Sequence, residues 1–195
     1  LFLNKRPHKS ENHTILITGG SSGIGFELAR QLSPSNKILV CGRTKEKLEK
    51  AKQALPDIDY LSCDISRPDE CERLFNWVQE HYPECNMLIN NAAIVHPGKF
   101  LQDEGMPEKA EHEIQTNVMA PIRLTHLFAT VLRQNEHPTI INITTGLVYV
   151  PRALYPIYNA TNAGLHAFTQ VLRSQAEGSP LNIIEVFFPA VDTPW

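Results

Sequence analysis

Short apolar runs alternate with segments of helical periodicity along almost the whole chain, and this alternation constrains the fold more than any other feature. Continuous apolar strands separated by helices are typical of a parallel sheet that is covered on both faces. Right-handed crossovers then predict a doubly wound, Rossmann-type α/β domain, with ligands beyond the carboxyl ends of the strands. The predicted strands are residues 15–18, 37–42, 60–64, 87–92, 139–145 and 182–188.

A chain of 195 residues with 42% hydrophobic residues can bury one core, so we expect a single domain. Residues 1–12 form a polar N-terminal tail, and the dinucleotide-binding domain is predicted to span 13–195. The chain stops at Trp195, shortly after the sixth strand. The sheet is therefore expected to be truncated at its C-terminal end, or only part of the protein is given.

Charge and composition exclude several classes of function. The formal net charge of -3 gives no general attraction to nucleic acid. No apolar run reaches the roughly 18 to 20 residues that a membrane span requires. The four cysteines and eight histidines lack metal-ligand spacing, so we expect no metal and reduced thiols. A cytoplasmic protein without a membrane span is predicted.

The stretch TGGSSGIG, residues 18–25, lies between the first predicted strand and a helix. Gly19 suits a tight turn, Gly23 lets the backbone approach a pyrophosphate, and Gly25 allows close packing of the helix. The amino terminus of the helix offers N–H donors to an anion. A simple tight turn is the alternative interpretation. The cofactor-binding residues predicted here are Gly19, Ser21, Ser22, Gly23, Ile24 and Gly25.

The second predicted strand ends in Cys41, Gly42 and Arg43, where an NAD enzyme usually has a carboxylate for the ribose hydroxyls. An arginine can instead pair with a 2′-phosphate, which favours NADP and makes NAD the less favoured cofactor. The alternative is an exposed arginine before a helix. Asp64, after the third strand, is placed for the adenine edge, although a capping role for Asp64 or Ser66 is an open alternative.

The stretch NNAA, residues 90–93, ends the fourth predicted strand with two adjacent amides. Such side chains suit hydrogen bonds that hold strands together or that bind a cofactor ribose. Asn91 and Ala92 are therefore candidate cofactor contacts.

At this point the chain resembles the short-chain dehydrogenase/reductase family, over essentially its whole length after the tail. The stretches that carry the resemblance are TGGSSGIG, SCDIS, LINNAA, QTNVMAPIRLT, INITTG, YNATNAGLHAF and FPAVDT. Within the family, the chain is most similar to DltE-type oxidoreductases. The resemblance implies a hydride-transfer site made of Asn117, Thr145, Tyr158 and Asn162, and cofactor contacts from Tyr158, Asn162, Pro189, Val191 and Thr193.

Three positions depart from the family pattern: Thr145 replaces a serine, Asn162 replaces a lysine, and Ala93 replaces a glycine. The hydroxyl of Thr145 can still donate to a substrate oxygen. Asn162 is the larger change, because an asparagine cannot supply the positive charge that lowers the pKa of Tyr158 from its ordinary value of about 10. Reduction needs only the neutral phenol, so it should suffer less than oxidation.

Another cation near Tyr158 would be needed to replace the positive charge of the missing lysine. Arg152, Arg173 and His166 are the nearby cations in the sequence, and a packed histidine is the favoured interpretation of His166. Asn117 is interpreted either as a holder of the water through which protons leave, as in the family, or as a helix-kink residue bonded to backbone.

Two functions remain open from the sequence. The first is an NADP-dependent oxidoreductase that acts on a small carbonyl or alcohol substrate. The second is a cofactor-binding protein that has lost its chemistry and acts as a sensor, scaffold or partner subunit. The family resemblance also implies a homodimer or homotetramer, associated through the predicted helices in 107–134 and 158–177.

Overall fold

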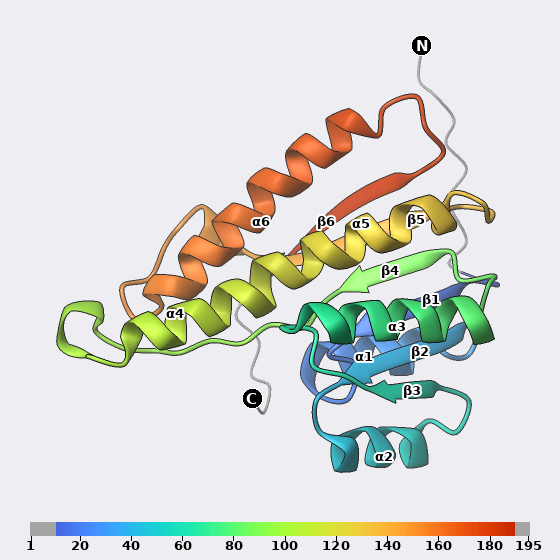
Figure 1. Cartoon of the computed structure of the whole chain (residues 1–195), viewed down its shortest axis with the longest axis horizontal. Helices are drawn as coiled ribbons and strands as arrows, with labels where there is room; N and C mark the ends of the chain where they lie inside the picture. The colour runs from blue at the N-terminus through green and yellow to red at the C-terminus, as the bar shows by residue number, and fades with distance from the viewer. Residues whose placement is uncertain (1–10, 190–195) are drawn as a thin grey trace.

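The computed structural model describes residues 11–189, and within them the chain folds around one parallel six-stranded sheet (Figure 1). The strand order is β3-β2-β1-β4-β5-β6, so the order reverses beside β1. This arrangement confirms the predicted doubly wound Rossmann-type sheet. The strands are β1 (Thr14–Thr18), β2 (Lys37–Gly42), β3 (Asp59–Ser62), β4 (Met87–Asn90), β5 (Thr139–Thr145) and β6 (Asn182–Phe188).

Helices connect the strands and cover both faces of the sheet. The α-helices are α1 (Gly23–Leu32), α2 (Lys45–Ala54), α3 (Pro68–His81), α4 (Met106–Ile114), α5 (Ala120–Leu132) and α6 (Pro156–Gln175). Two 3-10 turns, η1 (Phe100–Gln102) and η3 (Gly146–Val148), lie in the loops after β4 and β5. A π-helical turn, η2 (Gln115–Met119), joins α4 to α5.

Two apolar clusters fill the space between the sheet and its helices. The first lies between the sheet and α1 and α2, and its buried members include Ile15, Ile17, Ala29, Val40 and Leu48. The second lies under α3 and α5, where Leu74, Leu124 and Phe128 are fully buried, and α6 packs against it through Leu172 and Ala176. Burying large side chains of this kind typically contributes about 1.5 to 3 kcal/mol each.

One predicted helix differs from the structure. The sequence predicts a continuous helix from 107 to 134, whereas the structure has a π-helical turn in its middle. Pro121 explains the interruption, because it has no N–H to donate to the carbonyl of Asn117 one turn earlier, and its ring crowds that carbonyl. A wider π turn relieves this conflict and is common at functional sites.

Polar residues link the central strands to the helix layer. The Asn90 Nδ2 donates to Asn142 Oδ1 at 2.8 Å, and the Asn142 Nδ2 donates to Thr169 Oγ1 on α6 at 2.8 Å. These bonds connect α6 to the middle of β5 and, through it, to the last residue of β4. None of the helices within residues 11–189 is both long and apolar enough to cross a membrane. All four cysteines are free thiols.

Candidate active site at the carboxyl edge of the sheet

The glycine-rich turn has the conformation that its sequence predicts. Gly19 and Gly23 have φ angles of 68° and 54°, which favour glycine because other residues are strained there. Gly25 lies against the turn itself, since a Cβ at this position would collide with the Gly19 carbonyl and would lie 2.5 Å from Asn91 Nδ2. The turn therefore needs glycine for two different reasons.

The first turn of α1 is free to receive an anion. Ser22 is the N-cap residue, but its side chain makes no capping hydrogen bond, and no acidic residue lies in the first turn. The N–H groups that begin a helix carry a partial positive charge and have no partner within the helix. Ser21, Ser22 and Ile24 lie partly exposed around this helix start, so this end of α1 is suited to a phosphate group.

Asn91 connects the glycine turn to the end of β4. Its Nδ2 donates to the Thr18 carbonyl at 2.8 Å, and the backbone N–H groups of Asn91 and Ala92 both donate to Thr18 Oγ1 at 3.0 Å. Asn90 is also used between strands. Of the two alternatives for these amides, the structure therefore supports the holding of strands, and a cofactor contact from Asn91 or Ala92 stays a prediction.

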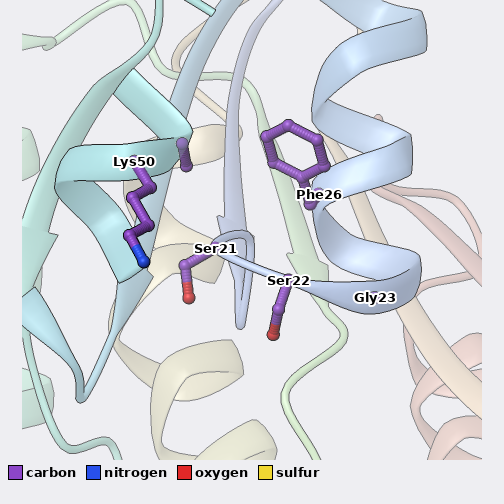
Figure 2. Close-up of a pocket in the computed structure, with 6 residues that line it drawn as sticks. Ser21, Ser22, Gly23, Phe26 and Lys50 are labelled. Atoms are coloured by element: carbon purple, nitrogen blue, oxygen red, sulfur yellow. The ribbon is translucent and has the colours of Figure 1, made fainter. Parts of the chain in front are cut away.

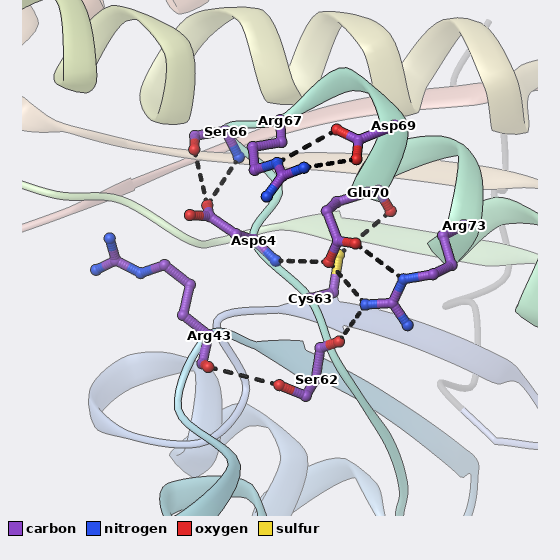
Figure 3. A network of polar contacts seen from close by, with 9 residues as sticks. All are labelled: Arg43, Ser62, Cys63, Asp64, Ser66, Arg67, Asp69, Glu70 and Arg73. Carbon is purple, nitrogen blue, oxygen red and sulfur yellow. Dashed lines mark hydrogen bonds and ion pairs between the residues drawn. The ribbon is translucent and has the colours of Figure 1, made fainter.

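The end of β2 carries Arg43 on the surface, with its guanidinium apart from the neighbouring carboxylates (Figure 3). Arg43 Nη1 lies 3.5 Å from His112 Nε2 on α4. The Asp64 side chain lies after β3 and accepts from the backbone N–H of Ser66 at 3.1 Å and from its hydroxyl at 2.8 Å. This is a contact within the turn, and the capping alternative is wrong, because Arg67 is the N-cap of α3 and no side-chain hydrogen bond caps this helix.

Asn117 lies in the π-helical turn and joins three segments of the site. Its Oδ1 accepts from the Ile94 N–H at 2.9 Å, and its Nδ2 donates to the Ile94 carbonyl at 2.8 Å and to Thr161 Oγ1 at 3.3 Å. The Thr161 hydroxyl donates to the Tyr158 carbonyl at 3.1 Å. The Asn117 side chain thus has the structural role that the helix-kink alternative describes, and it ties the loop after β4 to the first turns of α6.

Tyr158 and Thr145 follow β5 at the same edge of the sheet. Thr145 is the last residue of β5 and is buried, and its Oγ1 accepts from the Leu147 N–H at 3.4 Å. Tyr158 lies in the first turn of α6 and is partly buried. Because η3 contacts α6, the two hydroxyl residues come from adjacent segments, as the resemblance implies.

Burial raises the pKa of Tyr158 above its ordinary value, the Asn162 amide lowers it, and the carboxylate of Glu113 raises it. The Asn162 Nδ2 donates to the Tyr158 carbonyl at 2.9 Å, so the amide is engaged with backbone one turn earlier. The phenol therefore lies in a setting that favours its neutral form.

Glu113 is a site residue that the sequence interpretation missed. It lies on α4 with a fully buried side chain, and its Oε1 accepts from the His96 N–H at 2.7 Å and lies 3.0 Å from His96 Nδ1. Its Oε2 is buried and has no hydrogen-bond partner among residues 11–189. Met106, Glu113 and Asn117 recur at helical spacing on one buried face, and an acidic residue in such a pattern was the available signal.

The cations that were considered as substitutes for lysine are engaged elsewhere or lie on the surface. His166 Nδ1 lies 2.9 Å from Glu185 Oε2, and Arg173 Nε donates to the Ile183 carbonyl at 3.2 Å. Arg152 is exposed and contacts Asn159 through its backbone. The favoured interpretation of His166 as a packed histidine agrees with this geometry, and nothing in residues 11–189 places one of these three cations beside Tyr158.

The structure describes Ala93 and Pro189, but it does not describe the last two predicted cofactor contacts. Asn12 and His137 are the non-glycine residues with positive φ in the described part of the chain, so Ala93 replaces a glycine without backbone strain. Pro189 lies exposed after β6. Val191 and Thr193 lie outside the described residues. Between residues 11 and 189, no group of three or more His, Cys, Asp or Glu side chains is arranged to hold a metal ion.

The sequence of the chain is similar to those of known proteins. A model of the short chain dehydrogenase family matches residues 13–195. The chain is 40% identical over 186 residues to the uncharacterized oxidoreductase DltE of Bacillus subtilis, which covers 95% of this chain and 74% of that protein.

Two solved structures have the same fold. L-sorbose reductase from Gluconobacter frateurii, complexed with NADPH and L-sorbose, has a TM-score of 0.88 at 23% identity, covering 94% of this chain and 72% of that chain. The 3-ketoacyl-(acyl-carrier-protein) reductase from Brucella melitensis, complexed with NADH, has a TM-score of 0.88 at 22% identity, covering 95% and 79%. The two structures thus contain different nicotinamide cofactors.

Proposed function

Because the chain belongs to the short-chain dehydrogenase/reductase family of oxidoreductases, we propose that it transfers hydride between NADP and a carbonyl or alcohol substrate. The observation that carries the proposal is the placement of two features at one edge of the sheet. The glycine turn follows β1 there, and Tyr158 follows β5 there. In a doubly wound sheet, this edge is where ligands bind.

The proposed cofactor site begins at α1. Its uncapped N–H groups and its partial positive charge suit a pyrophosphate, Gly23 would let the backbone approach it, and Gly25 packs closely on the turn. Arg43 supports NADP over NAD, because the end of β2 has a guanidinium and lacks a carboxylate that would repel a 2′-phosphate. When bound, the nicotinamide supplies or accepts the hydride.

The chain's own residues manage the proton and the orientation of the substrate. In reduction, the Tyr158 hydroxyl donates a proton to the substrate oxygen, and in oxidation the phenolate accepts one. The Thr145 hydroxyl donates a second hydrogen bond to that oxygen. Asn117 positions Tyr158 through Thr161, because these side chains join the π turn to α6.

The replacement of the lysine by Asn162 affects the protonation state of the proposed proton donor. Burial and Glu113 raise the pKa of Tyr158, and a lysine that would lower it is replaced by Asn162. The neutral phenol is therefore the abundant form near neutral pH, and it is the form that reduction requires. We propose that Tyr158 acts from this neutral form, so that the reduction of a carbonyl starts from the abundant state of the phenol.

A second candidate is a protein that binds the cofactor but has lost its chemistry and acts as a sensor, scaffold or partner subunit. Asn162 is the observation that favours it. The Asn162 amide donates to the Tyr158 carbonyl, so it replaces neither the charge of a lysine nor its reach.

Cofactor binding and turnover test the proposal together. NADPH and NADH would be titrated into the natural chain, and reduction of a panel of aldehydes and ketones would be followed with the Tyr158→Phe and Asn162→Lys variants alongside. We expect tighter binding of NADPH, a loss of reduction of about 100-fold in Tyr158→Phe, and a gain in alcohol oxidation of about 100-fold in Asn162→Lys.

Each contrary outcome removes a different part of the proposal. Binding of NADPH without turnover in the natural chain, together with turnover in Asn162→Lys, would support the second candidate. Equal affinity for NADH and NADPH would reject the role of Arg43. Unchanged reduction in Tyr158→Phe would reject Tyr158 as the proton donor.

A further inference from the structure

A hollow of about 280 Å³ lies between the start of α1 and the middle of α2 (Figure 2). Ser21, Ser22 and Gly23 form one side, Phe26 and Ala51 form the apolar part, and Lys50 of α2 completes it. Figure 2 shows the Lys50 amine and both serine hydroxyls directed to the same end of the hollow, where the glycine turn leaves β1. A cation and two hydroxyl donors therefore line one small space.

Lys50 has no acidic partner among the described residues, in contrast to Lys45 and Lys52 of the same helix. Lys45 Nζ lies 3.8 Å from Glu49 Oε1, and Lys52 Nζ lies 3.1 Å from Asp59 Oδ1. Lys50 is exposed and makes no ion pair or hydrogen bond of this kind within residues 11–189. Its charge is thus available to an anion.

Ser21 connects this hollow to the end of β2. A Cβ added to Gly42 would lie 3.1 Å from Ser21 Oγ, so the hydroxyl lies directly against the residue that precedes Arg43. The end of β2 is where a dinucleotide presents the 2′ position of its adenosine ribose. Lys50 lines the hollow together with Ser21, and Arg43 follows Gly42 beside His112 of α4.

We infer that Lys50, together with Ser21, binds the 2′-phosphate of NADP and that this contact, added to that of Arg43, determines the preference for NADP over NAD. The inference rests on the proposed function. A phosphate monoester carries a charge of about −1.5 to −2 at neutral pH and has three acceptor oxygens. A guanidinium can donate hydrogen bonds to two of these oxygens, and a lysine amine and a hydroxyl can donate hydrogen bonds to the remaining acceptor positions.

Paired titrations with nucleotides that differ only in the 2′-phosphate test this inference. Dissociation constants for NADPH, NADH, 2′,5′-ADP and 5′-ADP would be measured for the natural chain and for Lys50→Gln. Lys47→Gln is the matched control, because Lys47 is exposed on the same helix and does not line the hollow. Lys50→Arg keeps the charge and tests rescue.

We expect Lys50→Gln to weaken NADPH and 2′,5′-ADP by about 10-fold, as one lost charge-assisted contact predicts, and to leave NADH and 5′-ADP unchanged. Lys50→Arg and Lys47→Gln should bind all four nucleotides like the natural chain. Equal weakening of all four nucleotides by Lys50→Gln would place the amine at the pyrophosphate and overturn the inference. A preference for NADPH that persists unchanged in Lys50→Gln would overturn it while leaving the proposed function intact. A natural chain that binds none of them would reject the proposed function itself.

Discussion

At the scale of single residues, the proposed chemistry depends on the charges around the phenol of Tyr158. A lysine in the family position is absent, and the buried carboxylate of Glu113 is close enough to raise the pKa of Tyr158. The motifs of the sequence predict Tyr158, Asn162, Thr145 and Asn117 as site residues. They do not predict Glu113, because a charged residue on a helix is ordinarily solvated and its contact with His96 joins segments whose proximity only the fold creates.

Replacing Glu113 with glutamine should lower the pKa of Tyr158, because it removes a buried negative charge while its amide oxygen can still accept from the His96 N–H. The oxidation rate rises with pH as the phenolate forms, so its rise should shift to lower pH in Glu113→Gln. Reduction needs the neutral phenol, so its decline at high pH should shift in the same direction. The measurement is kcat/KM against pH in both directions, in the natural chain and in Asn162→Lys.

Glu111→Gln is the control for this experiment, because Glu111 is exposed on the same helix and should leave both pH profiles unchanged. Superimposable profiles for Glu113→Gln and its parent would contradict the influence of Glu113 on Tyr158.

At the scale of elements, the strands were easier to predict than the helices that carry the site. The bounds of β2, β5 and β6 agree with the predicted runs 37–42, 139–145 and 182–188, because continuous apolar runs mark buried parallel strands. The third and fourth strands end earlier than predicted, at Ser62 and Asn90. The residues that follow these strands, such as Asp64 and Asn91, use their side chains for contacts within turns or between strands. The pattern of apolar residues does not predict such contacts, so it does not predict where these strands end.

Gly25→Ala should destabilise the turn between β1 and α1, because the new methyl group would collide with the Gly19 carbonyl and with Asn91 Nδ2. We expect the free energy of unfolding to fall by about 1 to 3 kcal/mol and dinucleotide binding to be lost. Urea denaturation and a nucleotide titration measure the two effects.

Gly164→Ala is the matched control within α6, where nothing lies within 4 Å of an added Cβ. This variant should be unchanged or more stable by up to about 1 kcal/mol, because alanine favours a helix over glycine. Equal stability of Gly25→Ala and the natural chain would show that the turn has more room than its geometry indicates.

At the scale of the whole molecule, the two ends of the sheet have separate tasks. The carboxyl ends of the strands carry the glycine turn and Tyr158, whereas Asp59, at the start of β3, joins several elements at the opposite end. Its carboxylate pairs with Lys37 and Lys52, and it accepts from the Tyr82 hydroxyl at 2.8 Å. Burial opposes ionisation of Asp59, but hydrogen bonds from Lys37, Tyr82 and Lys52 outweigh it and lower its pKa to about 2.

Asp59→Asn should therefore lower the stability of the fold without changing the site. A carboxyl whose pKa is lowered by folding stabilises the folded state above its ordinary pKa near 4, and this contribution is lost as the pH falls through about 2. Because the carboxylate is partly exposed, we expect the free energy of unfolding to fall by about 1 kcal/mol at pH 7. This difference between the variant and the natural chain should shrink between about pH 4 and pH 2.

Urea denaturation at several pH values measures this difference, and NADPH affinity at pH 7 serves as the control, since it should not change. A difference in stability that is the same at pH 7 and at pH 2 would assign the effect to packing and exclude the charge of Asp59.

The π turn between α4 and α5 has a consequence for how this architecture can vary. One buried face of α4 carries Glu113 to the proposed active site, and one buried face of α5 carries Leu124, Phe128 and Leu132 to the core. Adding or deleting one residue in η2 would rotate everything beyond it by about 100° relative to what precedes it. The number of residues in this segment keeps the two faces in phase, so we expect its length to be constrained independently of Asn117, the residue whose side chain the proposed site uses.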